Sequence, residues 1–261
     1  MAVKGLDVFR EYFAGYEDAL LLIGGTACDA WFAAQGLAFR ATIDLDIVLI
    51  IEAVSADFVD RFSSFVEEGA YTTRTRSIDG TPELYRFQKP GNNAFPKELE
   101  LFSRGDELMD LREDQRIIPV RIEDAESLSA ILLDDDYYSL IMEHRSRTAG
   151  LWMADAAALV PLKARAWIDL TTRKEAGESV DSKKIKKHRR DAFALAATLP
   201  NEPGPGLSEQ IVADLLRFLH SSPPTHADWG AILDSIADDI GGRPSPIALL
   251  DAVVRYFRLT K

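Results

Sequence analysis

The chain has 261 residues, 47% of them hydrophobic and 28% charged, so it can bury a substantial core. Its formal net charge of −12 argues against nucleic-acid binding by the surface as a whole, because a phosphate backbone attracts lysine and arginine. It has neither an apolar run of about 20 residues, as a membrane helix needs, nor a signal-peptide pattern, so we expect a cytoplasmic protein without a membrane partner.

The first half of the chain predicts helices alternating with strands. Apolar residues at helical spacing, with serine starts and glycine stops, predict helices over residues 7–18, 26–36 and 55–69. Short apolar or β-branched runs predict strands over residues 19–25, 42–51, 83–90, 98–104 and 116–122. The strands at 83–90 and 98–104 flank a turn rich in proline, glycine and asparagine, so we predict that they pair antiparallel.

From about residue 125 the pattern changes to consecutive helices. Amphipathic segments predict them over residues 125–145, 155–177, 181–199, 206–221 and 245–259. We therefore predict an α+β protein with two domains: residues 1–125 with a mixed sheet flanked by helices, and residues 126–261, all helical.

Two aspartates interrupt an apolar strand. Side chains alternate along a strand, so Asp44 and Asp46 share one face, while Ile43, Leu45 and Ile47 point into the core. Two carboxylates on one face repel each other unless a cation lies between them, and hard oxygen ligands suit Mg²⁺. The alternative is an exposed sheet edge whose charges prevent aggregation.

Two further features accompany this pair. In the predicted strand at 98–104, Glu98 and Glu100 also share a face, so a third carboxylate joins the cluster if the strands are suitably aligned. Gly24, Gly25 and Thr26 lie between a strand and a helix, where glycines let the backbone approach a phosphate and a helix N-terminus favours an anion.

The segments "IGGTACDAW" and "TIDLDIVL" together resemble the signature of the polymerase-β-like nucleotidyltransferase superfamily. More narrowly, Thr42 and the segments "LELFSR", "LKARAWIDL" and "DSKKIKKHRRDAF" resemble the AbiEii/MenT-type nucleotidyltransferases, many of which are toxins of toxin–antitoxin pairs. The resemblance covers roughly residues 20–195. It implies a nucleotidyltransferase-fold mixed sheet flanked by helices, followed by an all-helical C-terminal domain.

The resemblance also implies roles for individual residues. Gly24 and Gly25 would cradle the triphosphate of an NTP, and Thr26 would donate to it from the helix start. Asp44, Asp46 and Glu100 would hold two Mg²⁺ ions, with Glu100 as the third acid. Related families use aspartate at this third position. Because the glutamate side chain is longer, either Glu98 or Glu100 could reach the metal, so Glu98 stays open as the alternative. Lys163 would contact the nucleotide phosphates; otherwise it is a surface lysine.

The expected activity is Mg²⁺-dependent transfer of a nucleoside monophosphate from an NTP to an acceptor hydroxyl, releasing pyrophosphate. The acceptor is RNA, in particular tRNA, or a protein, and the chain is a candidate toxin with an antitoxin partner. One alternative is a small-molecule (aminoglycoside-like) acceptor. The other is a non-catalytic nucleotidyltransferase-fold binding module.

Other charged and polar residues have interpretations of their own. The basic run at 183–190 either solvates a helix or meets an anionic ligand, and Lys186, Lys187 and Arg190 would be the residues that approach substrate. Arg40 either faces the site or lies on the surface. We predict that His188 makes a polar contact or lies on the surface, that Cys28 is buried, and that residues 134–136 form a turn or cap.

Overall fold

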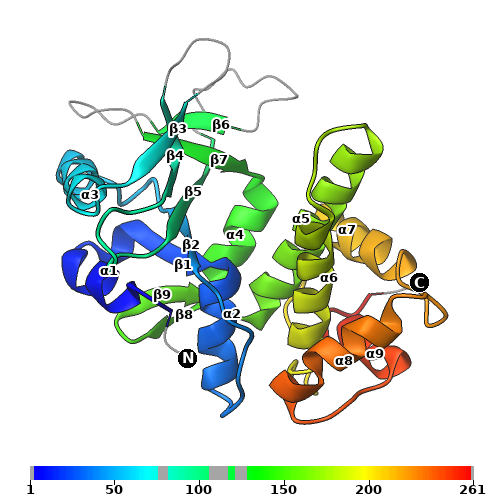
Figure 1. Ribbon diagram of the computed structural model, residues 1–261. Coiled ribbons are helices and arrows are strands. Elements are labelled where there is room, and N and C mark those ends of the chain that lie inside the picture. The colour runs from blue at the N-terminus through cyan, green and yellow to red at the C-terminus, as the bar shows by residue number, and fades with distance from the viewer. Residues whose placement is uncertain (1–2, 76–81, 106–116, 121–127, 260–261) are drawn as a thin grey trace. The chain divides into compact units, whose positions relative to one another are not determined.

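The computed structural model describes residues 3–75, 82–105, 117–120 and 128–259 (Figure 1). The chain divides into two compact units, each described by itself below. The first unit comprises Met1–Ala27, Ala41–Tyr138 and Arg145–Ala154, and the second comprises Cys28–Arg40, Ser139–His144 and Asp155–Lys261. Helices and a mixed sheet make up the fold, which confirms the predicted α+β class.

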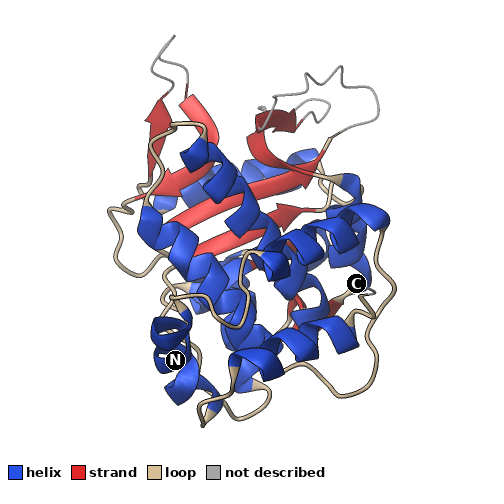
Figure 2. Cartoon of the chain, turned by 90° about the vertical axis from the view of Figure 1, so that its right-hand side faces the viewer, coloured by secondary structure: helices blue, strands red, loops and turns tan. Residues whose placement is uncertain are grey.

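The described strands all belong to the first unit and form one sheet (Figure 2). Their bounds are β1 Leu20–Ile23, β2 Asp44–Leu49, β3 Thr72–Thr75, β4 Pro82–Gln88, β5 Glu98–Arg104, β6 Ile117–Val120, β7 Leu128–Leu133, β8 Arg145–Thr148 and β9 Leu151–Ala154. The order is β3-β4-β5-β2-β1-β9-β8, with β7 pairing β5 and β6 pairing β7. The pairs β2–β5, β1–β9 and β5–β7 are parallel, whereas β4 and β5 are antiparallel as predicted.

Aromatic side chains form the core beneath one face of this sheet. Helix α1 (Leu6–Tyr12) leads into the short helix η1 (Glu17–Ala19), and α3 (Ala56–Glu68) is preceded by Ser55, whose hydroxyl caps it. The buried ring of Phe62 on α3 contacts that of Phe87 on β4, with centroids 5.5 Å apart. Helix α3 therefore covers the sheet face that carries Phe87, and residues of alternate parity on β4 lie on the opposite face.

Two helices begin in the first unit and continue in the second: α2 (Gly24–Ala33) and α4 (Asp135–Glu143). Cys28 on α2 is buried, as predicted. The Asp134 side chain accepts a hydrogen bond from the backbone N–H of Asp136, at 3.0 Å, so this acidic cluster is a helix cap as predicted.

The second unit is built on five helices among the residues that the structure describes: α5 Ala156–Glu175, α6 Ser182–Ala196, α7 Glu209–His220, α8 Trp229–Ile240 and α9 Pro246–Tyr256. Four of them have a side-chain cap, from Asp155, Asp181, Ser208 and Ser245. Phe193 of α6 is fully buried and contacts the rings of Phe218 and Trp229, so the core of this unit joins α6, α7 and α8.

Several expectations need correction. The predicted helix at 125–145 is correct only over α4, because strand β7 precedes α4 and strand β8 begins at Arg145. The short apolar run before Asp134 suits a buried strand as well as a helix, and periodicity alone does not distinguish them. Ile43 precedes β2 and is 47% exposed, so it does not point into the core.

The third correction concerns where the helical part of the chain begins. Strands β7, β8 and β9 all follow residue 126, so the chain is helical without further described strands only from Asp155 onward. The predicted division near residue 125 itself lies outside the described residues. Helix α8 was not among the predicted elements, and the predicted first helix ends early, at Tyr12.

Candidate functional site

Four carboxylates occupy one face of two neighbouring parallel strands. Asp44 lies beside Glu98, and Asp46 lies beside Glu100, as Cα partners of β2 and β5. Burial alternates along β5 and over Asp44–Ile47 of β2, and the four acids are all at partly exposed positions. The structure therefore brings together the acids predicted from the sequence, and it places Glu98 and Glu100 on the face of Asp44 and not away from it.

An arginine that the sequence analysis did not single out lies on the same face. Arg86 of β4 is the Cα partner of Glu100, on the side of β5 away from β2. Its Nη2 forms an ion pair with Glu100, and its Nε lies 3.5 Å from Oε1 of Glu98. The signal was the alternation in "ELYRFQ", which puts Arg86 and the core residue Phe87 on opposite faces of β4.

The glycines at the start of α2 lie against the acidic strand. A Cβ added to Gly24 would lie 1.7 Å from Oδ2 of Asp46, and Gly24 has a φ of +64°, which disfavours any other residue. A Cβ on Gly25 would lie 2.2 Å from Oγ1 of Thr42. Both glycines are thus required by close packing, Gly24 against β2 and Gly25 against Thr42 in the segment before it.

Thr26 has a structural role in the same region. Its side chain is buried, and its hydroxyl donates to the backbone carbonyl of Asp44 at 3.1 Å. This bond joins the first turn of α2 to the first residue of β2, so it helps to position the aspartates. A contact from Thr26 to a nucleotide stays a prediction.

The donor set fits a hard divalent cation in part. Asp44 and Asp46 supply carboxylate oxygens on one strand, and Gly24 leaves room for the Asp46 side chain where any Cβ would collide with it. Within the ranges that the structure describes, however, no group of three or more histidine, cysteine, aspartate or glutamate side chains is placed so that it could hold a metal ion. The third acid, Glu100, is in an ion pair with Arg86, and it fits such a site only once that pair is exchanged.

The second unit contains a buried charge cluster around Asp191 of α6, which is fully buried. Arg40 donates to both its carboxylate oxygens, from Nε at 2.7 Å and from Nη2 at 2.5 Å. Lys163 of α5 lies with Nζ 3.6 Å from Oδ2 of Asp191, and its side chain is only 6% exposed. Of the two interpretations of Lys163, the surface lysine is therefore wrong, while its contact with nucleotide phosphates stays a prediction. Arg40 is likewise not a surface arginine.

Electrostatics keep Asp191 ionised. Burial by itself raises the pKa of a carboxyl group, but here the hydrogen bond from Arg40 and the charges of Lys163, Arg40 and Arg190 outweigh it. The pKa of Asp191 is therefore held below its ordinary value. Arg190 is buried and also forms an ion pair with Asp239, so its guanidinium stabilises the fold. This contradicts the prediction that Arg190 is one of the residues that approach substrate.

His188 lies one helical turn before Asp191. Its ring is half-buried, and its Nδ1 is shielded from solvent and has no hydrogen-bond partner among the described residues. Burial, helped by the charge of Lys163, lowers the pKa of His188 from 6.5 to about 3. The ring is therefore neutral at physiological pH, and it is not the simple surface histidine of one interpretation.

The basic run on α6 divides into two kinds of residue. Lys183, Lys184 and Lys186 are exposed, whereas Arg189 is buried, with its guanidinium 4.6 Å from the Trp167 ring centroid. Arg189 also forms an ion pair with Asp228, at 3.2 Å. The lysines thus provide a cationic surface, and the arginines stabilise the second unit.

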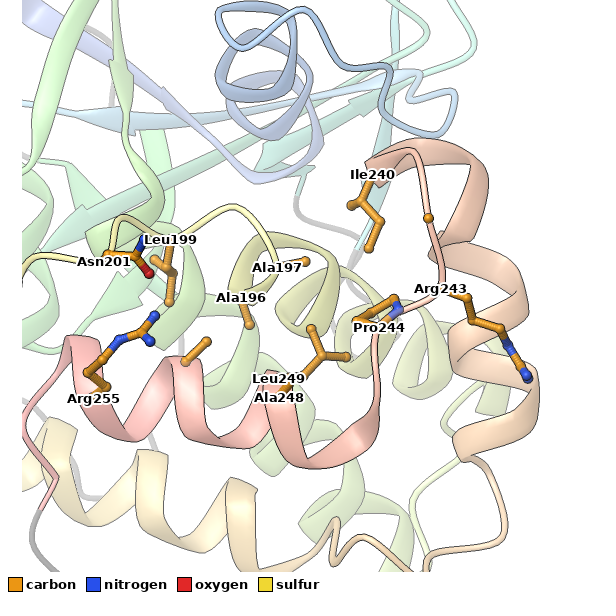
Figure 3. Close-up of a pocket in the computed structure, with 12 residues that line it drawn as sticks. Ala196, Ala197, Leu199, Asn201, Ile240, Arg243, Pro244, Ala248, Leu249 and Arg255 are labelled. Atoms are coloured by element: carbon orange, nitrogen blue, oxygen red, sulfur yellow. The ribbon is translucent and has the colours of Figure 1, made fainter.

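A cavity of about 450 Å³ lies in the second unit between the C-terminal ends of α6 and α8 and one side of α9 (Figure 3). Its lining is mostly apolar or small, and its polar members are Asn201, Arg243 and Arg255. The Arg243 side chain extends away from the other labelled residues and pairs with Asp234 at 2.9 Å. The cavity contains none of the residues that the sequence analysis selected, and it has no carboxylate that could hold a metal.

Comparisons of the chain with protein-family models, with curated proteins and with solved structures find no match. None of the described helices is long and apolar enough to cross a membrane.

Proposed function

We propose that the protein is a Mg²⁺-dependent nucleotidyltransferase with a nucleotidyltransferase fold, which moves a nucleoside monophosphate from an NTP to an acceptor hydroxyl. The observation that carries the proposal is the register of β2 and β5, which aligns Asp44 with Glu98 and Asp46 with Glu100 on one face. Like charges directly opposite each other destabilise a sheet, so a cationic ligand is a physical reason for this arrangement. The resemblance of the glycine and Asp-x-Asp segments to nucleotidyltransferases supports the same activity.

Each residue of the candidate site would have its own role in the proposed reaction. Asp44 and Asp46 would hold the Mg²⁺ ions, with Glu100 as the third acid, and Thr26 keeps the start of their strand in place. When bound, the metal supplies stabilisation of the charge on the attacking and leaving oxygens. Lys163, whose ammonium group is paired with the Asp191 carboxylate, would neutralise the triphosphate.

The acceptor is proposed to be RNA, with tRNA as the first candidate, or a protein side chain. The exposed lysines of α6 support an anionic acceptor, because they concentrate positive charge on a chain that is acidic overall. A role as the toxin of a toxin–antitoxin pair, with an antitoxin as partner, is proposed from the resemblance alone.

The proposal is tested by titrating each of the four NTPs into the protein with and without MgCl₂. We expect one or two of the NTPs to bind the wild type only when Mg²⁺ is present. Binding is measured by calorimetry and by the shift in Tm. Asp46→Asn should abolish that binding. Asp60→Asn is the matched control, since it removes the same charge from an exposed position on α3 and should bind as the wild type does. Absence of metal-dependent binding in the wild type would remove the transferase proposal.

A further inference from the structure

The acidic face of the sheet contains a cation of its own. Arg86 offsets one of the four formal negative charges of Asp44, Asp46, Glu98 and Glu100. Its side chain is 21% exposed, and those of Glu98 and Glu100 are 23% and 16% exposed, so the ion pairs are partly withdrawn from solvent. Charges in such a setting are screened less than charges on an open surface.

The contacts of Arg86 are divided between two acids. Nη2 pairs with Glu100, while Nε approaches Glu98 at 3.5 Å and makes no hydrogen bond in the part of the chain that the structure describes. A guanidinium that binds one carboxylate in a bidentate manner uses two aligned N–H groups for it. Arg86 instead bridges neighbouring acids of β5, which leaves it less firmly held than a bidentate pair.

We propose that Arg86 is the resident counter-ion of this carboxylate face and that a divalent cation exchanges with it at Glu100. Without metal, Arg86 holds Glu98 and Glu100 in place beside Asp44 and Asp46. With metal bound, Glu100 would contact the ion in place of Arg86 and would complete a set of three carboxylates with Asp44 and Asp46. Arg86 is thus a positioning residue that sets how tightly the site binds metal. This inference rests on the metal site of the proposed function.

The charge balance gives the direction of the effect. A metal ion and the Arg86 guanidinium compete for the same carboxylate, so metal binding must overcome the existing pair. Removing the positive charge of Arg86 eliminates that competition, and it also removes electrostatic repulsion between the arginine and the incoming cation. The site should then bind metal more tightly, while the sheet without metal becomes less stable because its acids repel each other.

The test is calorimetric titration of MnCl₂, and then MgCl₂, into the full chain without any nucleotide. Arg86→Gln should bind the metal about tenfold more tightly than the wild type. Its Tm should lie below the wild-type value without metal and return to it when metal is added. Arg147→Gln is the matched control. Arg147 lies on the edge strand β8 and pairs with Asp18, so removing its charge should leave metal affinity unchanged.

A second variant covers the case in which Arg86→Gln fails to fold. Arg86→Lys keeps the charge but offers a point charge in place of a planar fork, so it should fold and bind metal about two- to fivefold more tightly than the wild type. Metal affinity equal to the wild type in the folded Arg86 variants, or a lowered Tm that metal does not restore, would overturn the proposal. Tight metal binding by Arg86→Gln, together with no NTP binding by the wild type in the separate NTP titration, would instead support Arg86 as the counter-ion and reject the transferase activity.

Discussion

Arg40 and Asp191 are 151 positions apart in the sequence and form a two-point ion pair in the second unit, with Nε 2.7 Å from Oδ1 and Nη2 2.5 Å from Oδ2. The pair attaches the segment that follows α2 to helix α6. Lys163 and Arg190 also lie within ion-pair distance of the same carboxylate, at 3.6 and 3.3 Å. One buried carboxylate therefore pairs with three cations, and the dependence of these cations on Asp191 predicts the effect of removing its charge.

We predict that Asp191→Asn destabilises the protein by about 3–5 kcal/mol, because the buried cations around it lose their compensating charge. Urea unfolding of the wild type and the variant measures the difference. Asp169→Asn serves as the control, since Asp169 lies on α5 at a half-exposed position and should cost less than about 1 kcal/mol. Equal stability of Asp191→Asn and the wild type would show that the cluster contributes nothing to the fold.

The lowered pKa of His188 predicts a pH dependence of stability. Its folded pKa of about 3 lies below the ordinary 6.5, so the unfolded chain binds the proton more readily. The stabilisation is therefore complete above pH 6.5 and declines as the pH falls from there toward 3. Asp191 has a lowered pKa too, but its contribution is lost only in the more acidic range, below the ordinary pKa of about 4 for aspartate.

The measurement is urea unfolding of the wild type and His188→Gln between pH 7.5 and 4.5, where Asp191 stays ionised in both. The wild type should lose stability across this range, and the variant should lose less. In an NMR titration, Lys163→Gln should shift the His188 pKa upward, because a neighbouring positive charge has been removed. An unchanged pH dependence in His188→Gln would contradict the account.

Gly24 offers a test of the packing between α2 and β2. Gly24→Ala puts a methyl group 1.7 Å from Oδ2 of Asp46, so we expect the carboxylate to move and metal-dependent NTP binding to weaken at least about tenfold. Gly15→Ala is matched to it, because Gly15 also has a positive φ, of +90°, but an added Cβ would meet nothing within 4 Å. Equal NTP affinity in both variants would show that the position of Asp46 does not matter for binding.

Local patterns predicted the elements that carry the candidate site. Alternation along "TIDLDIVL" and "ELELF" predicts which residues share a face, since it follows from strand geometry alone. The register that sets Asp46 beside Glu100 is a property of the pairing between two strands whose partner residues are 54 positions apart, and no local pattern contains it. The sequence analysis does not single out Arg86 for the same reason. Its importance depends on the pairing of its strand, β4, with the side of β5 that faces away from the aspartate strand β2.

The second unit shows the same limit. Sequence analysis identifies the helices that carry Lys163 and Asp191, but the ion pairs of Asp191 with Arg40 and with Lys163 depend on long-range packing. The basic positions of "KKHRRDAF" look alike in a helical pattern, although Lys186 is exposed, Lys187 is half-buried, and Arg189 and Arg190 are buried. Which charges are buried depends on which partners the tertiary fold supplies.

The most direct test of the central claim is to incubate the protein and MgCl₂ with NTP labelled on either the α- or the γ-phosphate, in the presence of bulk tRNA. The account predicts that α-label becomes attached to RNA or protein, that γ-label leaves in pyrophosphate, and that Asp46→Asn abolishes both while Asp60→Asn does not. Transfer of γ-label, or no transfer of α-label to any acceptor in the wild type, would contradict nucleotidyl transfer.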